Sequence, residues 1–287
     1  MTVTEYANQA GDIFVLSDSF IRIKELIDDE SSTIDDISDV IIIDPALTGT
    51  ILKLANSAFF NYPGKIDTVS KAVLVLGITE VYNLVITYFT AQAFKALSIE
   101  QDYLDYLDYF WGKSVDCALL IKFLGCRLNI PNGERLFILG MLHNLGELIV
   151  KQISPDKIIE SKNSKNVDNS FLPWDIQRNV LGFTYGECAA ELLKRWHLPY
   201  NIVAPIRNQD EDNFELINTE TQLLYIAKRI MIYQKSSQFN DQGELVEQLQ
   251  LSSLGISDDI LRMASDYCDS ERLSILSVLN PTSINIY

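Results

Sequence analysis

The sequence predicts an all-α, multi-helical protein, because helix signals follow one another along most of the chain. Apolar residues recur at intervals of three and four residues, which is the spacing of a helix with one buried face. Helix-start signals precede several of these segments, and alternating strand patterns are nearly absent; the run Val40–Ile43 is the one ambiguous stretch. With 47% apolar residues among 287, the chain is expected to bury a core and to form two packed helical halves.

The first hundred residues contain five predicted helices. Apolar stripes mark helices near residues 20–27 and 34–41, with Ser32 or Thr33 placed to cap the second. A third helix should begin at Pro45, because the Asp44 carboxylate can accept free backbone N–H groups and proline needs no N–H at the first helical position. A turn over 61–64 then leads to a short helix over 68–77 and a longer one over 79–97.

The later segments are also helical by pattern. A long amphipathic helix is expected over 103–130, with a break near Gly112, and shorter helices should start at Pro173 and after Thr184. Ser98 with Gln101, Thr184 with Glu187, and Thr219 with Gln222 fit the reciprocal capping box at a helix start. Segments 161–170 and 208–215 are predicted to be a polar surface loop and an acidic loop, and the last helices are expected around 220–235, 241–250 and 258–279.

The most apolar stretch, residues 137–150, should be one helix buried at the centre of a domain. His143 lies in its middle, Asn144 follows, and Glu147 shares a face with His143 one turn on. A buried imidazole suits a metal site only where further ligands converge on it. Gly140 and Gly146 are expected to permit close helix contact, since no strand-turn-helix context for a phosphate loop is present.

Charge excludes several kinds of partner. The formal charge is −16 and no basic tract occurs, so binding to nucleic acid or to an anionic membrane surface is not expected. The first residues lack the basic and apolar regions of a signal peptide, and no uninterrupted apolar run reaches the ~18 residues of a membrane span. The scattered Cys117, Cys126, Cys188 and Cys268 are interpreted as free buried thiols in a reducing cytoplasm.

Several motifs stand out along the chain: the string from Asp44-Pro45 to Asn56-Ser57, the Leu-Gly pair ending at Gly77, Trp111-Gly-Lys-Ser114, and the segments 139–146 and 182–199. Together they closely resemble the HDOD family of bacterial regulatory domains. The resemblance covers roughly residues 15–235 and implies an all-helical fold related to metal-dependent HD phosphohydrolases. It also implies a non-catalytic signalling module. We expect an N-terminal helical half over 1–100, a degenerate HD-like half over 101–235, and a helical extension over 236–287, as one continuous structural unit.

The chain departs from the family where metal ligands are expected. An ammonium replaces an imidazole at Lys113, and an amide replaces the bridging carboxylate at Asn144. A tyrosine replaces the histidine at Tyr185. By the same resemblance, Gln209-Asp210 stands where the family has a His-His pair, and Ala227-Lys228 stands where the superfamily has an Ala-Asp pair. The resemblance thus defines the vestigial metal-pocket positions Lys113, His143, Asn144, Tyr185 and Lys228.

The residue inventory agrees with this reading. The chain has two histidines, His143 and His197, whereas a catalytic divalent ion needs at least three suitable protein ligands. We therefore expect no metal and no other cofactor. The alternative is that carboxylates such as Asp116, Glu147 and Glu187 hold Mg²⁺ or Mn²⁺. If Lys113 is buried, it is expected to pair with Glu147 or Asp116.

The sequence favours a cytoplasmic regulatory module of bacterial type that binds a signalling protein or a small signal molecule and has no chemistry of its own. A divergent phosphohydrolase acting on a nucleotide or phosphorylated signal is the alternative, and a sensor that uses the emptied metal pocket is compatible with the first reading. Exposed aromatics are favoured anchors for protein contacts. A partner groove is therefore expected at Phe59, Phe60 and Tyr62, just after the Asn56-Ser57 string.

Overall fold

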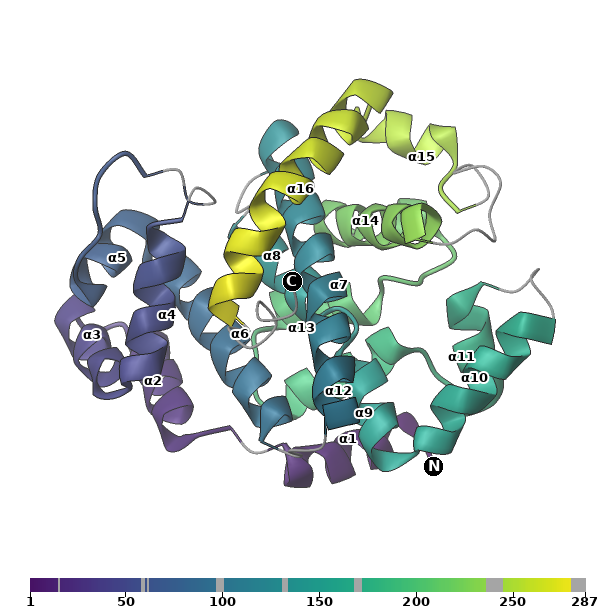
Figure 1. Ribbon diagram of the computed structural model, residues 1–287, viewed down its shortest axis with the longest axis horizontal. Coiled ribbons are helices and arrows are strands. Elements are labelled where there is room, and N and C mark those ends of the chain that lie inside the picture. Colours follow the sequence, from purple (N-terminus) through teal and green to yellow (C-terminus); the bar gives the residue numbers. More distant parts are fainter. Residues whose placement is uncertain are drawn as a thin grey trace. The chain divides into compact units, whose positions relative to one another are not determined.

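The computed structural model describes residues 1–14, 16–57, 60, 62–96, 101–130, 134–167, 172–235 and 245–279. Every regular element in these ranges is a helix and none is a strand, so the all-α prediction is confirmed (Figure 1). Two compact units share the chain. The first contains Met1–Phe14 and Asp116–Ser265, and the second contains Val15–Val115 and Asp266–Tyr287. This grouping differs from the boundaries expected along the sequence, because the first helix packs against helices of the later segment.

The second unit is built from short capped helices: α2 (Asp18–Asp28), α3 (Ile34–Ile43), α4 (Pro45–Ala55), α5 (Val69–Leu76) and α6 (Ile78–Lys95). It also holds the first part of α7 (Gln101–Arg127) and the end of α16 (Asp258–Leu279). Thr33 caps α3, so the ambiguous run Val40–Ile43 is helical. α3 packs against α2, α4 and α5, while α6 packs against α2, α4 and α5.

Asp44 caps α4 as predicted. Its Oδ1 accepts the backbone N–H groups of Ala46 at 2.9 Å and Leu47 at 3.0 Å, and Pro45 occupies the first helical position. Two of the free donors at this helix start are therefore satisfied by one carboxylate oxygen.

The other residues of the family string also satisfy backbone groups. The Asn56 amide donates to the carbonyls of Leu52 at 2.7 Å and Ile66 at 2.6 Å, and its oxygen accepts the Ile66 N–H at 2.8 Å. Asn56 thus pairs with both backbone groups of Ile66, as a neighbouring strand would. The Ser57 hydroxyl donates to the Leu54 carbonyl.

Gly77 joins α5 to α6 with φ 88° and ψ 153°, a conformation that is essentially restricted to glycine. α6 begins directly after it, at Ile78, without a side-chain cap, so Thr79 lies inside the helix and does not open it. Trp111 is buried on α7, edge-on to Phe110 at 5.1 Å between ring centroids. α7 runs through Gly112, so the expected break there was wrong.

The first unit is centred on α12 (Tyr185–Arg195), which packs against α1 (Val3–Ile13), α9 (Leu145–Ile153) and α13 (Tyr200–Arg207). α8 (Glu134–Leu142) lies against α13 and α14 (Thr219–Lys235). The remaining elements are α10 (Pro155–Val167), α11 (Pro173–Leu181), the 3₁₀ turn η2 (Phe214–Leu216) and α15 (Gln248–Ser253).

Two local predictions for this unit were wrong. The surface loop expected over 161–170 is wrong up to Val167, because α10 continues there and a polar segment can form the exposed side of a helix. The Thr219 capping box is also wrong: Asn218 accepts from the Thr221 N–H at 2.9 Å instead, and Thr219 is already helical. The Thr184 box forms as predicted, whereas Ser98 lies outside the described residues.

One described stretch, Arg135–Ile153, is long and apolar enough to cross a membrane by length and composition, although no uninterrupted apolar run of that length was found in the sequence. It is 72% buried inside the protein, as a core helix would be. The pair Val69–Leu76 and Ile78–Lys95 meets the same criterion only when taken together, and it bends by 118°.

Candidate functional site

The segment around His143 consists of two helices, so the prediction of one continuous helix over 137–150 was wrong. α8 ends at Leu142 and α9 begins at Leu145, which leaves His143 and Asn144 at the break. His143 is 6% exposed, and its Nδ1 lies 2.7 Å from the Gly140 carbonyl oxygen. Because a carbonyl can only accept, this nitrogen carries the proton. The Asn144 amide donates to the Glu147 carboxylate.

Two glycines allow the helices of this site to approach closely, as predicted. A β-carbon at Gly146 would lie 2.1 Å from the carbonyl oxygen of Tyr185, the first residue of α12. A β-carbon at Gly140 would lie 2.4 Å from the Cα of Ala118 on α7. The break at His143 is therefore held against backbone on two sides, and neither position tolerates a side chain without a shift.

Tyr185 and its neighbours form the next layer. The Tyr185 N–H donates to the Gln177 side-chain oxygen at 2.8 Å, and burial raises the pKa of the Tyr185 phenol. Thr184 accepts the Glu187 N–H at 3.1 Å while the Glu187 carboxylate accepts the Thr184 N–H. Glu187 thus serves a helix start, and this hydrogen bond competes with its use as a metal ligand.

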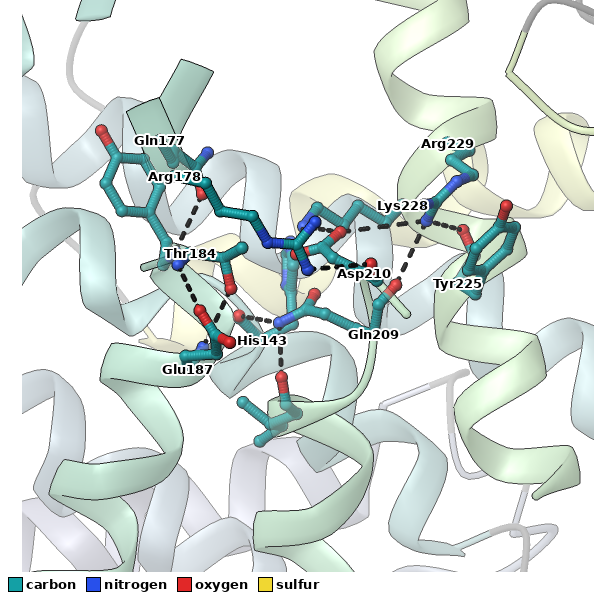
Figure 2. Close-up of polar contacts among 12 residues, drawn as sticks. His143, Gln177, Arg178, Thr184, Glu187, Gln209, Asp210, Tyr225, Lys228 and Arg229 are labelled. Atoms are coloured by element: carbon teal, nitrogen blue, oxygen red, sulfur yellow. Dashed lines mark hydrogen bonds and ion pairs between the residues drawn. The ribbon is translucent and has the colours of Figure 1, made fainter. Parts of the chain in front are cut away.

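Gln209 links the break to the end of α13. Its amide nitrogen donates to the His143 carbonyl at 2.6 Å and to the Ile206 carbonyl at 2.9 Å, and the residue is fully buried. Figure 2 shows the amide reaching from the segment after α13 to the backbone of His143. A position where the family resemblance suggests an imidazole therefore holds an amide committed to two backbone acceptors.

Asp210 and Lys228 form a buried ion pair. The Lys228 ammonium lies 2.7 Å from both carboxylate oxygens of Asp210, and the two residues are 7% and 2% exposed (Figure 2). Burial lowers the pKa of Lys228, and the adjacent Asp210 carboxylate opposes that shift. Asp210 belongs to the acidic loop predicted over 208–215, but its carboxylate turns inward to meet a cation on α14.

Arg229 completes the group that we call the buried polar cluster. Its guanidinium carbon lies 3.2 Å from the ring centroid of Tyr225 and 3.9 Å from that of Trp174. Its Nη1 donates to the Gln209 carbonyl at 3.2 Å and lies 3.9 Å from Asp210 Oδ1. Stacking and hydrogen bonding together hold this cation away from water. The buried polar cluster is defined by Gln209, Asp210, Lys228 and Arg229.

The structure brings four of the five vestigial metal-pocket positions into the first unit. His143 and Asn144 form the helix break, Tyr185 lies against Gly146, and Lys228 belongs to the buried polar cluster. Lys113 belongs to the second unit, where its ammonium lies 4.1 Å from the ring centroid of Tyr109. Its expected pairing with Glu147 or Asp116 would join the two units and stays a prediction.

The site does not present a set of metal ligands. Among the residues that the structure describes, no three His, Cys, Asp or Glu side chains gather closely enough to hold a metal ion. Where the resemblance suggests carboxylate and imidazole ligands, the side chains are an ammonium at Lys228, an amide at Asn144 and a phenol at Tyr185. An ammonium beside Asp210 already supplies the positive charge that a cation would bring, so these residues do not fit an HD-type metal centre.

The sequence analysis identified Asp210 and Lys228 only through the family resemblance, and it missed Arg229, Trp174 and Tyr225. A signal was nevertheless present. Lys228-Arg229 interrupts a helix whose other residues from Leu223 to Met231 are apolar or aromatic, and all of them are buried. Two adjacent cations in such a helix require a buried counter-charge, because unpaired burial of a charge is too costly.

The proposed partner groove is described only in part. Phe60 is half-buried, Tyr62 is 39% exposed, and Phe59 lies outside the described residues. The Tyr62 ring borders Gly64, where a β-carbon would lie 2.8 Å from the ring. These observations place one exposed aromatic in the turn between α4 and α5, and a groove there stays a prediction.

The described elements of both units are helical, and the positions where the resemblance suggests metal ligands include an ammonium, an amide and a phenol. The family model described as "HDOD domain" matches residues 13–212. The chain therefore belongs to the HDOD family, which is related to the HD phosphohydrolases.

Relatives extend this result. A protein of Treponema pallidum (strain Nichols) is 27% identical over 205 residues, which is 70% of this chain but 38% of that relative. The crystal structure titled "Putative phosphohydrolase" from Shewanella amazonensis SB2B is 23% identical with a TM-score of 0.70, covering 95% of this chain and 97% of that one. A "Putative signal transduction protein" from Marinobacter aquaeolei VT8 is 24% identical with a TM-score of 0.68, covering 95% and 60%. The two structural likenesses show the shared fold.

Proposed function

We propose that this protein is a non-catalytic regulatory module that binds a signalling protein or a small signal molecule. The observation that carries the proposal is the Asp210–Lys228 ion pair. The ammonium of Lys228, at a vestigial metal-pocket position, satisfies the Asp210 carboxylate. The HDOD family membership and the name of the Marinobacter relative support a role in signal transduction. A bacterial origin and a cytoplasmic location are part of this proposal.

The chemistry of the site supports the absence of turnover. Hydrolysis of a phosphate ester at an HD-type centre requires a cation that lowers the pKa of water and neutralises developing charge on the phosphate oxygens. Here the protein's own ammonium is held 2.7 Å from each Asp210 oxygen, and the Gln209 amide is occupied by two carbonyls. His143 alone could act as a general base, but that contributes only about 10²–10⁴-fold.

The rigidity of the site supports a structural use of the same residues. Gln209 connects α13 to the His143 break, and the cations of α14 connect to Asp210 and Trp174. A network of this kind links α11, α13, α14 and the break between α8 and α9 within the first unit. Such a scaffold can present partner-binding surfaces of the first unit, and the proposal separately includes the turn with Phe60 and Tyr62 in the second unit.

The test combines elemental analysis with turnover assays. We expect purified protein to contain no stoichiometric transition metal and to leave phosphomonoesters and phosphodiesters intact when Mn²⁺ or Mg²⁺ is added. His143→Ala serves as the matched control, because this side chain is the one imidazole of the site. Stoichiometric metal that is lost in His143→Ala, or turnover abolished by that change, would establish the divergent phosphohydrolase instead.

The partner groove has a separate test. Phe60→Ala, compared with Ile159→Ala on the exposed side of α10, should weaken the capture of a co-purifying partner by the folded protein if the turn after α4 forms the groove. A folded Phe60→Ala protein that retains every partner would remove the groove from the proposal while leaving the metal argument intact.

A further inference from the structure

The exposed side of α3 carries two kinds of side chain in sequence. The first part of the helix presents aspartates to solvent, and the last turn presents two isoleucines, Ile42 at 52% exposure and Ile43 at 75%. Residues four apart lie above one another on a helix, so Asp35, Asp39 and Ile43 form one line. We name this side the α3 face and define it by Asp35, Asp36, Asp39, Ile42 and Ile43.

The core of the unit does not explain these isoleucines. α3 packs inward through Ile37 and Ile41, which are fully buried, while Ile42 and Ile43 turn away from them. α5, which packs against α3, adds Leu74 at 73% exposure. Single exposed apolar residues are ordinary, but two adjacent branched ones on one helix, with a third exposed on a helix packed against it, indicate a contact surface.

The surrounding charge is of one sign. From residue 28 to residue 44 the chain has no Lys or Arg, while its acidic residues are Asp28, Asp29, Glu30, Asp35, Asp36, Asp39 and Asp44. Lys24 pairs with Asp28 and thereby offsets one of these charges. Asp35 and Asp39 are exposed to solvent on the α3 face itself.

We propose that the α3 face docks a basic amphipathic segment of another protein, with its Lys or Arg residues on Asp35 and Asp39 and its apolar residues on Ile42 and Ile43. Charge decides this choice of occupant. Nucleic acid and anionic lipid surfaces carry the same sign as the aspartates and are repelled. A second copy would bring either the same aspartates or another part of a chain of charge −16 that has no basic tract.

A helix is a suitable shape for this partner. Helices bind through apolar anchors spaced three, four and seven residues apart, and opposite charge at the rim speeds and orients the encounter. The inference deepens the proposed function, on which it rests, since it names the partner class of a regulatory module. If the peptide does not dock on α3, the inference fails, but the argument that the site does not fit a metal still holds. If the protein turns over a phosphate ester with added metal, the proposed function fails, whatever the docking result.

The probe is a short fluorescent peptide in which Leu recurs every three to four residues, so that a helix has Leu on one face and Lys on the other. Two comparators replace either every Lys with Glu or every Leu with Gln. Binding to the full chain is measured by fluorescence anisotropy at two salt concentrations. We expect the Leu/Lys peptide alone to bind well, with an affinity that falls as salt rises.

Matched variants locate the binding. Ile42→Ser/Ile43→Ser should weaken the affinity by at least about tenfold, as the loss of central anchors does. Asp35→Asn/Asp39→Asn should weaken it and reduce its dependence on salt. The control is the double variant Leu216→Ser/Asp212→Asn in the first unit, where the leucine is about as exposed as Ile43 and the carboxylate is also exposed. This variant should bind the peptide as wild type does.

A photo-crosslinking version of the peptide tests wild-type protein without any substitution. Crosslinks are expected within residues 34–44. The inference is overturned if crosslinks fall elsewhere, if the isoleucine variants bind as wild type does, or if the control variant loses as much affinity as the α3 variants. Loss in the aspartate variants alone would mean unspecific attraction to an acidic protein and would equally overturn it.

Discussion

The capping residues of the second unit and the buried polar cluster of the first unit use their polar groups differently. In the second unit, Asp44, Asn56 and Ser57 satisfy backbone groups at the ends of helices, each close in sequence to its partners. In the first unit, the buried polar cluster joins side chains from different elements, such as Asp210 and Lys228, inside the core. The difference teaches that one set of polar residues secures local backbone geometry, whereas the other joins distant elements through an internal ion pair.

The largest effect is expected in the buried polar cluster. Asp210→Ala should cost about 3–5 kcal/mol of unfolding free energy, because it leaves the Lys228 ammonium buried without its counter-charge. Urea unfolding measures the change. Glu211→Ala, the exposed neighbouring carboxylate, is the control and should stay within about 0.5 kcal/mol of wild type.

A double substitution sharpens that result. Asp210→Leu/Lys228→Met removes both charges at once, so it should cost less than the sum of the two single changes. Additive losses would show that the two side chains do not act as a pair.

The second unit should respond through its backbone. Gly77→Ala should cost about 2 kcal/mol, because φ 88° with ψ 153° is strained for any residue with a β-carbon. No neighbouring atom lies within 4 Å of such a β-carbon, so the loss would report the backbone conformation and not a clash. Gly49→Ala lies on α4 with equally open space and serves as the control; a loss no larger than in that variant would contradict the strain.

Removal of the α4 cap should have a smaller effect. Asp44→Ala should cost about 1 kcal/mol, since two backbone N–H groups lose their acceptor. Asp44→Asn keeps an acceptor oxygen and should recover most of the loss. A urea midpoint unchanged in Asp44→Ala would mean that the cap contributes nothing in solution.

Cysteine reactivity compares core and surface without altering the chain. Burial raises the pKa of the Cys188 thiol to about 12, whereas Cys126 is exposed. The thiolate is the reactive form, so a thiol reagent at mildly alkaline pH should label Cys126 quickly and leave Cys188 unmodified until the protein unfolds. Labelling in urea provides the control, and rapid native labelling of Cys188 would contradict its burial.

The sequence predicted local features better than contacts between distant elements. Thr33, Asp44 and Thr184 marked real helix starts, because each cap and its partners lie within a few residues. Pro173 marked another as the first residue of α11, where proline needs no N–H. The Thr219 box failed because Asn218, one residue earlier, caps the helix instead.

The site was less predictable. His143, Asn144 and Tyr185 were identified by resemblance, but the helix break between α8 and α9 was not foreseen, since apolar residues continue on both sides of His143-Asn144 without a proline, and Asn144 makes no side-chain cap. The Asp210–Lys228 pair joins residues 18 positions apart, one after α13 and the other on α14. Asp210 lies among solvated acids in the sequence, and only the tertiary packing distinguishes it from Glu211 and Asp212.

The central claim is that Lys228 takes the place of a metal ion beside Asp210, and titration of Mn²⁺ into the chelator-treated protein tests it most directly. Calorimetry should detect no stoichiometric site in wild type, and Mn²⁺ should not raise the unfolding temperature, because a ligand that binds the folded state would raise it. Binding of one Mn²⁺ per chain by wild type, lost in both His143→Ala and Asp210→Asn, would contradict the account.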